Sequence, residues 1–346
     1  MEIVNLLDAQ VIPPPPITKH TLELGTKYSP DVACVPYKYT MGNFLESIEK
    51  GANLLLQAGG ASCRYQYYGE VQEVALHKLG YNGVTILRFT NSKASMLKTL
   101  MKFKKLNPRL TYRRMIHGFA MFFAKIYALD KIETFIRQNV GFQEKEGEME
   151  GILKQFLSRL NAERSLLKIS KIKNEFLQKL QEVKINKPAN PIRVAVVGEF
   201  YVTIEPFSNF FVERELGKKG IEVYRNVDLT AEFVEAVNRK NYVKNELKQA
   251  KPYLKYHVGA HATKTIATVL ELIHEGYDGF IHVKPFGCVP EVNAMSALHK
   301  ISKDFKVPII YFSFDSQTSE TGVKTRLEAF YDMLKMKKEK ESKKTI

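Results

Sequence analysis

Short apolar runs alternate with amphipathic segments in the first quarter and in the second half of the chain. ANLLLQAGG and NGVTILRF predict buried strands, and YGEVQEVALHKLG between them predicts a helix that stops at a glycine. IRVAVVGEF, YDGFIHVKPFG and VPIIYFSF predict further strands that alternate with helices, one of which is expected over FFVERELGKKG. Strands that are apolar along their whole length are typical of parallel sheets covered by helices. The pattern therefore predicts an α/β fold with two doubly wound, Rossmann-like lobes.

The residues between these two regions have the period of helices throughout. RRMIHGFAMFFAKIYALDKIETFIRQ is one example, and KPANPI follows as a boundary. The tail KMKKEKESKK has no apolar face and is expected to be marginally ordered. We therefore expect four parts: a first α/β lobe at 1–92, a basic helical segment at 93–190, a second α/β lobe at 191–334, and a basic tail at 335–346.

The net charge of +15 is concentrated in the helical part of the chain, where residues 91–190 hold 21 Lys and Arg against 9 Asp and Glu. Solvated helix faces explain such a segment most simply, although an acidic protein partner or a phosphate-bearing substrate would also fit. No nucleic-acid-binding signature accompanies the charge, so we expect no nucleic-acid partner. The longest apolar stretch, 118–129, is too short to span a bilayer and contains Lys125. We expect a cytoplasmic protein without membrane association.

The chain has three cysteines, Cys34, Cys63 and Cys288, and no CxxC pair. A sparse, odd set argues against a disulfide framework and fits a reducing compartment. Two stretches that end in cysteine share one pattern. Both run from a helix-ending glycine through an apolar strand to the cysteine; they are EKGANLLLQAGGASC and HEGYDGFIHVKPFGC. Cys-Val-Pro also occurs twice, in ACVPY and GCVPE.

We interpret DVACVPYK as a short strand that ends in a cysteine loop, followed by a helix over NFLESIEKGA. With this interpretation all three cysteines follow the carboxyl ends of strands, where open α/β sheets bind their ligands. If the two lobes face each other, the three thiolates can converge across the cleft between them.

Three converging thiolates would suit a 4Fe–4S cluster that keeps one iron open to substrate. Gly60 and Gly287, beside two of the cysteines, would let the backbone approach the cluster. A Cys₃His zinc site that uses His257, His261 or His282, a larger or shared iron–sulfur cluster, and three unrelated thiols remain alternatives.

Five separated stretches of the sequence resemble those of a known protein family. It resembles the 2-hydroxyacyl-CoA dehydratase D-component family, and within it most closely the branch related to acyl-CoA dehydratase activases. The stretches cover most of both predicted lobes and little of the helical segment; they are IPPPPITKHTLELGTKYSPDVACVPYKYTMGNFLESIEKGAN, GGASCRYQYYGE, VVGEFYVTIEPFSN, GYDGFIHVKPFGCVPEV and FDSQTSETGVKTRLEAF.

The resemblance implies a 4Fe–4S cluster held in the cleft by Cys34, Cys63 and Cys288. It also implies a separate ATPase, a homodimer with its own iron–sulfur cluster, that delivers low-potential electrons under anaerobic conditions. Relatives use such electrons to dehydrate 2-hydroxyacyl-CoA, to reduce benzoyl-CoA, or to reduce small molecules through a double cubane. The chain contains no P-loop GxxxxGK[ST], so the ATPase is expected to be another polypeptide. A homodimer, a paralogous second subunit, or a non-catalytic electron-transfer or scaffold role remains open.

Three further residues are candidates for the same site: Arg64 for cofactor binding, and Glu291 and His261 as catalytic residues. Arg64 directly follows Cys63 and could offset the negative charge of the cluster. Glu291 could transfer protons, or could be stabilised in the first turn of the following helix. His261 opens a predicted helix whose free amides could hold an anion or line the cleft.

Overall fold

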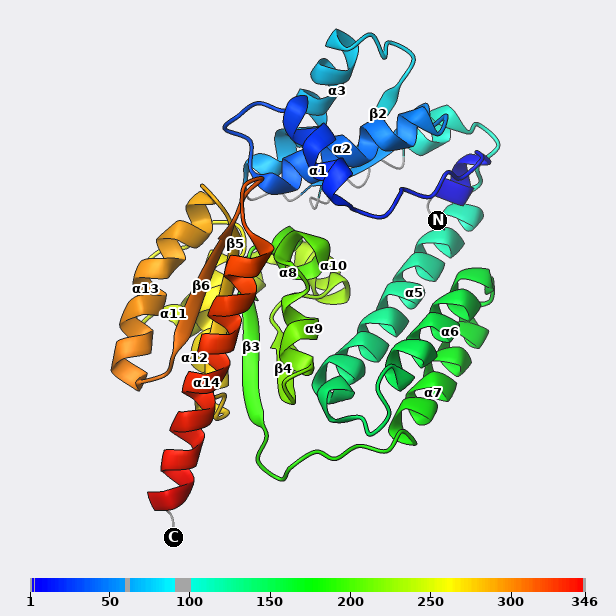
Figure 1. Ribbon diagram of the computed structural model, residues 1–346. Helices are drawn as coiled ribbons and strands as arrows, with labels where there is room; N and C mark the ends of the chain where they lie inside the picture. The colour runs from blue at the N-terminus through cyan, green and yellow to red at the C-terminus, as the bar shows by residue number, and fades with distance from the viewer. Residues whose placement is uncertain (1, 3, 60–62, 91–100, 345–346) are drawn as a thin grey trace.

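The computed structural model describes residues 2–344 apart from 3, 60–62 and 91–100. The side chains of residues 4, 58, 59, 64, 65, 89, 90, 236, 237, 342 and 344 also lie outside the description. The chain forms an α/β structure with two parallel sheets (Figure 1). None of the described helices combines the length and the apolar character needed to cross a bilayer.

The first sheet pairs β1 (Leu54–Gly59) with β2 (Thr85–Thr90) in parallel, as the apolar runs predict. It packs against α2 (Val35–Glu49) and α3 (Tyr68–Lys78) around a core that contains Met41, Leu55 and Ile86. A short helix, η1 (Val4–Leu7), precedes this part of the chain, and η2 (Arg64–Tyr67) leads into α3. In the described residues this sheet has two strands, so the expected doubly wound first lobe is present only as a small α/β unit.

Helix α1 (Lys19–Lys27) crosses α2 with backbone against backbone. A Cβ atom added to Gly25 would lie 1.7 Å from the carbonyl oxygen of Lys38, and one added to Gly42 would lie 1.9 Å from that of Thr21. The two helices can approach this closely only because both crossing positions lack a side chain.

The second sheet has the strand order β4-β3-β5-β6, all parallel. Its strands are β3 (Ile192–Gly198), β4 (Ile221–Arg225), β5 (Gly279–Pro285) and β6 (Ile309–Phe314). Both faces of β3 are buried, since Val194 and Val196 belong to one core cluster and Ala195 and Val197 to another. The chain runs from β3 outward to β4 on one side, and later to β5 and β6 on the other. The reversal between β3 and β5 is where such sheets bind their ligands.

Helices cover this sheet on both faces (Figure 1). They are α8 (Phe200–Ile204), α9 (Val212–Gly217), α10 (Leu229–Val237), α11 (Arg239–Ala250), α12 (Ala262–His274), α13 (Val289–Phe305) and α14 (Glu320–Lys344), with η4 (Phe207–Asn209) before α9. Helix α14 continues without a break over residues 335–344, which belong to the segment expected to be a separate basic tail.

The helical segment contains α5 (Tyr112–Asn139), α6 (Glu148–Ala162) and α7 (Leu166–Gln181), with η3 (Val140–Phe142) after α5. These helices share their own core around Ile132, Phe156 and Phe176. Helix α5 lies along β4, the edge strand of the second sheet. Covering an edge strand with a helix protects its unpaired backbone groups from other chains.

Two sequence-based boundaries are wrong. Residues 31–34 form a turn instead of a strand, and α2 begins at Val35 because Pro36 lacks an N–H and suits the first turn of a helix. The expected strand before Cys34 is therefore absent from the described structure.

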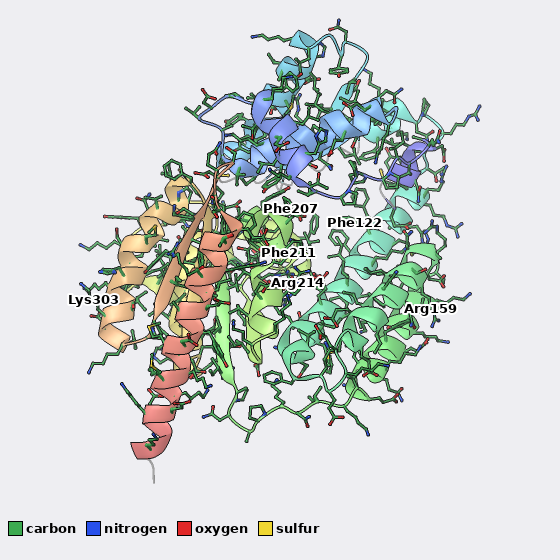
Figure 2. All side chains as sticks on the ribbon, viewed as in Figure 1. Phe122, Arg159, Phe207, Phe211, Arg214 and Lys303 are labelled. Atoms are coloured by element: carbon green, nitrogen blue, oxygen red, sulfur yellow. The ribbon has the colours of Figure 1, made fainter. Side chains whose placement is uncertain are left out.

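The second wrong boundary is the start of α9, which excludes the two phenylalanines that precede it. Phe210 and Phe211 have φ values of 55° and 58°, in the left-handed region. The Asn209 side chain holds this turn, because its Nδ2 donates to Val202 O at 2.7 Å and its Oδ1 accepts from Val212 N at 3.1 Å. The Arg214 guanidinium stacks over the Phe211 ring, 4.3 Å from its centroid (Figure 2).

Candidate metal centre at the cysteines

Cys34 and Cys288 occupy equivalent positions at the beginnings of two helices. Each is the N-cap residue, of α2 and α13 respectively, and each is followed by Val-Pro in the first turn. The repeated Cys-Val-Pro therefore marks two helix N-termini, where the macrodipole favours a thiolate. Cys63 lies directly before η2, in the loop that leaves β1. The prediction that each cysteine follows a strand holds for Cys63 and Cys288 and is wrong for Cys34.

The charge of Cys63 acts on Cys34, and the charge of Cys34 acts on Cys288. Burial is the main cause that raises the pKa of Cys34 to about 11, and the charges of Glu199 and Cys63 add to it. Burial likewise raises the pKa of Cys288, with further contributions from Glu199, Glu291 and Cys34. Cys34 and Cys288, far apart in the sequence, therefore lie close enough for their charges to interact.

The raised pKa values of Cys34 and Cys288 decide how reactive these thiols are. Buried thiols with raised pKa values are protonated near neutral pH and are poor nucleophiles. Bound metal ions deprotonate their thiol ligands outright. In the described part of the chain, no group of three or more His, Cys, Asp or Glu is arranged around a single metal ion. In a cubane each cysteine binds a different iron, so its ligands need not surround one point.

The histidines considered as zinc ligands are engaged elsewhere. His257 Nδ1 lies 2.9 Å from Thr263 Oγ1, His261 Nε2 lies 2.9 Å from Glu232 Oε2, and His282 Nε2 lies 2.8 Å from Glu291 Oε2. The geometry thus gives no support to a Cys₃His zinc site.

The other predicted site residues have varied positions. Glu291 is 1% exposed and pairs with His282 beneath the first turn of α13. His261 is the N-cap residue of α12, and its ring stacks on Phe200 with the centroids 5.6 Å apart. Gly287 has a φ of 74°, a conformation that favours glycine between β5 and Cys288. Gly60 and the side chain of Arg64 lie outside the described residues.

Three functional candidates were missed by the sequence analysis. Tyr68 Oη lies 2.6 Å from Cys34 Sγ, and Glu199 follows β3 at the strand-order reversal. Lys284 is 4% exposed on β5; burial lowers its pKa, while the charges of Cys288 and Glu291 act in the opposite direction. Its interaction with the charge of Cys288 is of the kind expected of Arg64. A lysine inside an apolar strand is unusual, and this signal could have identified it.

The contact between Tyr68 and Cys34 leads to a prediction about thiol reactivity. The hydrogen bond from Tyr68 lowers the pKa of Cys34 against the larger effect of burial. In the Tyr68→Phe variant the pKa of Cys34 is therefore expected to rise further, and alkylation of this thiol in the metal-free protein should slow several-fold. Peptide mass spectrometry after timed iodoacetamide treatment measures the rate. Tyr67→Phe, at a residue 59% exposed, is the matched control. Equal rates in both variants would show that the phenol does not act on the thiol.

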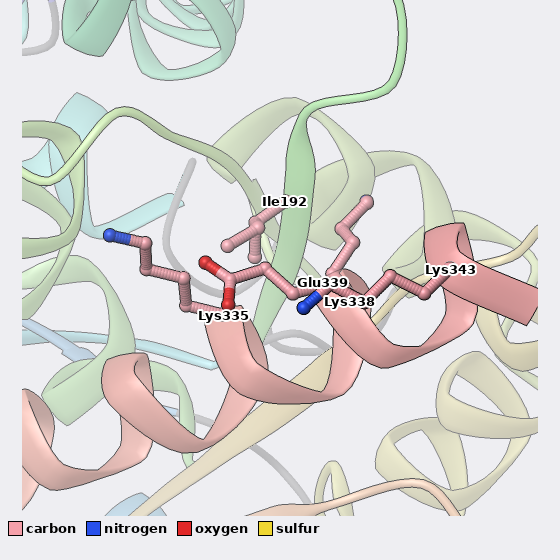
Figure 3. A pocket seen from close by; sticks show the side chains of 5 residues that line it. All are labelled: Ile192, Lys335, Lys338, Glu339 and Lys343. Atoms are coloured by element: carbon pink, nitrogen blue, oxygen red, sulfur yellow. The ribbon is translucent and has the colours of Figure 1, made fainter.

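A surface hollow of about 460 Å³ lies at the opposite end of the sheet (Figure 3). It is lined by Ile192 at the start of β3 and by Lys335, Lys338, Glu339 and Lys343 of α14. The Lys338 ammonium already donates hydrogen bonds to Pro191 O and to the Asp278 carboxylate, so its charge is paired within the protein. This hollow is separate from the cysteine site.

Comparison with known proteins does not assign a family. No family model matches the chain, and no curated protein matches it.

Proposed function

We propose that the protein is the iron–sulfur component of an ATP-dependent two-component reductase or dehydratase system. In this proposal Cys34, Cys63 and Cys288 hold a 4Fe–4S cluster with one open iron, which accepts low-potential electrons from a separate ATPase. The observation that carries the proposal is the matching position of Cys34 and Cys288, which are 254 residues apart in the sequence: each is the N-cap residue of a helix that begins with Val-Pro, and the charge of Cys34 acts on Cys288. The family resemblance of the sequence motifs is the basis for the proposed reaction class and for the proposed ATPase partner.

The chain supplies groups suited to hold a negatively charged cluster. When bound, the cluster supplies one-electron transfer at low potential. The N-termini of α2 and α13 stabilise the thiolates of Cys34 and Cys288 through their macrodipoles. Tyr68 can donate a hydrogen bond to the sulfur of Cys34, and Lys284 offsets negative charge beside Cys288. Together these groups lower the cost of burying several negative charges at one place.

We infer that the two α/β parts act as lobes with the cluster between them. Val35 and Tyr39 of α2 belong to the core of the second sheet, and Tyr39 stacks on Tyr201 at a centroid distance of 6.1 Å. This packing keeps Cys34 beside the carboxyl edge that bears Cys288. A CoA thioester or another small molecule would bind at the open iron, and the reducing cytoplasm would keep the cysteines from forming disulfides.

A second candidate is a non-catalytic electron-transfer or scaffold subunit with the same cluster. It is favoured by the pairing of Glu291 with His282 and of His261 with Glu232, which engages both candidate catalytic residues within the protein. Redox titration in the presence of candidate acyl-CoA substrates separates the two roles. A substrate-dependent spectral change is expected only for the catalytic component.

Metal analysis of anaerobically purified protein tests both candidates. We expect about four irons and about four acid-labile sulfides per chain, and an EPR signal after reduction. A count near eight per chain or per dimer would indicate a larger or shared cluster. Zinc alone, or no metal after anaerobic reconstitution, would contradict the proposed function.

A further inference from the structure

Helix α5, which begins beside η1 at the N-terminal end of the chain (Figure 1), exposes a stripe of large apolar side chains. At 3.6 residues per turn the four side chains fall within about 60° of the helix circumference and extend over about 22 Å of its length. We call them the apolar stripe; they are 37–71% exposed and consist of Tyr112, Ile116, Phe123 and Tyr127. Large apolar side chains that share one exposed face mark a contact site more often than single ones do.

The charge around the apolar stripe has one sign. Residues 101–129 contain seven Lys and Arg and no Asp or Glu. Arg114 and Lys125 pair with acidic residues of the N-terminal segment, Asp8 at 2.7 Å and Glu2 at 2.8 Å. In the described part of the chain, six further cations close to the stripe in sequence or in space form no ion pair; they are Lys102, Lys104, Lys105, Arg113, Lys131 and Lys173. This face of the protein is therefore positively charged.

Both tyrosines of the stripe have lysine ammonium groups over their rings. Lys104 Nζ lies 4.2 Å from the centroid of the Tyr112 ring. Lys131 Nζ and Lys173 Nζ lie 5.5 Å and 5.2 Å from the centroid of the Tyr127 ring. Cations and amphipathic rings thus lie together at both ends of the stripe, and purely apolar side chains lie between them. Tyrosine and lysine side chains of this kind place their polar ends in a lipid headgroup layer while their apolar parts lie deeper.

The composition of this face favours a lipid surface over a protein partner. Interfaces between proteins are depleted of lysine relative to the rest of the surface, whereas five of the six unpaired cations here are lysines. A leaflet of anionic lipids is negative everywhere and attracts a basic surface without matching individual charges. A helix with an apolar stripe and basic neighbours lies in the plane of such a surface, with its apolar side chains between the headgroups.

We propose that the apolar stripe and the lysines around it form a docking surface for an anionic lipid membrane. Because the stripe follows the axis of α5, this helix would lie along the membrane surface. The sequence-based expectation of no membrane association depends on the short apolar stretch at 118–129, which bears on spanning a bilayer and not on lying at its surface. The proposal does not depend on the cysteines or on a metal.

A single tryptophan tests the proposal directly, because the chain contains none. In the Ile116→Trp variant, vesicles of equal parts phosphatidylcholine and phosphatidylserine should shift the fluorescence emission to shorter wavelength, and brominated acyl chains should quench it. Vesicles of phosphatidylcholine alone should have little effect, since they carry no net charge. Val74→Trp is the matched control and should show neither effect; Val74 is 56% exposed on α3, where Glu70 and Glu73 lie near by in the sequence.

An Ile116→Trp emission that stays unchanged with the mixed vesicles would overturn the proposal. A shift with poly-L-glutamate and none with vesicles would also overturn it, and would indicate an acidic polypeptide as the partner. Equal shifts in Ile116→Trp and Val74→Trp would show that the stripe is not the part of the protein that meets the lipid.

A second measurement separates a localised surface from the effect of net charge. Sedimentation with the mixed vesicles should show about fivefold weaker partitioning for Arg113→Gln, since each basic residue near an anionic leaflet contributes about 1 kcal/mol. Lys78→Gln removes the same charge from an exposed residue of α3 and should partition like the wild type. Equal losses in both variants would show that only the net charge of the protein acts, which would contradict the proposed docking surface.

Discussion

The Cys288→Ser variant should lose most of its iron, from about four atoms per chain to near zero. Serine offers a hard hydroxyl in place of a soft thiolate, and only two cysteine ligands would remain. The helix itself should tolerate the change, because Cys288 is the N-cap residue of α13 and serine is among the best N-cap residues. Iron and sulfide analysis after anaerobic reconstitution measures the effect.

Because Cys288 is an N-cap residue, the stability of the Cys288→Ser variant serves as a control for folding. Thermal unfolding of the metal-free variant should occur at or slightly above the wild-type temperature, which would separate loss of a ligand from loss of the fold. Cys34→Ser should behave in the same way, since Cys34 begins α2. A Cys288→Ser protein that keeps its full iron content and its spectrum would show that the ligand assignment is wrong.

Strands β3 and β5 could be predicted from the sequence because both of their faces are largely buried. Their apolar runs contain few polar side chains, and these are Arg193, His282 and Lys284. The start of α2 could not be read in the same way. The run from Val32 to Val35 is as apolar as a strand, and only Pro36 shows that a helix begins there.

From the sequence, the site could be predicted only from the type of its residues and from the small number of cysteines. Three cysteines in a long chain stand out, and the repeated Cys-Val-Pro marks two of them. The partners depend on contacts across the fold: Tyr68 reaches Cys34 from α3, and Glu232 reaches His261 from α10. No spacing rule connects such pairs, since each distance is set by the packing of separate elements.

The Gly25→Ala variant should lose about 3 kcal/mol or more of unfolding free energy. The new Cβ would lie 1.7 Å from the carbonyl oxygen of Lys38, and a backbone atom cannot rotate away as a flexible side chain can. Helix α1 must therefore move off α2. Because Lys38 lies one turn after Cys34, the same displacement should also lower the iron content. Chemical denaturation and metal analysis of one preparation measure both effects.

Gly151→Ala is the matched control, because Gly151 is also helical but an added Cβ there meets nothing within 4 Å. Alanine is the better helix former at both positions, so the control should gain up to about 1 kcal/mol. The difference between the two variants then measures the steric contact alone. If Gly25→Ala were as stable as the control and bound as much iron as the wild type, the close crossing of α1 and α2 would not position Cys34, and the link between this packing and the metal site would fail.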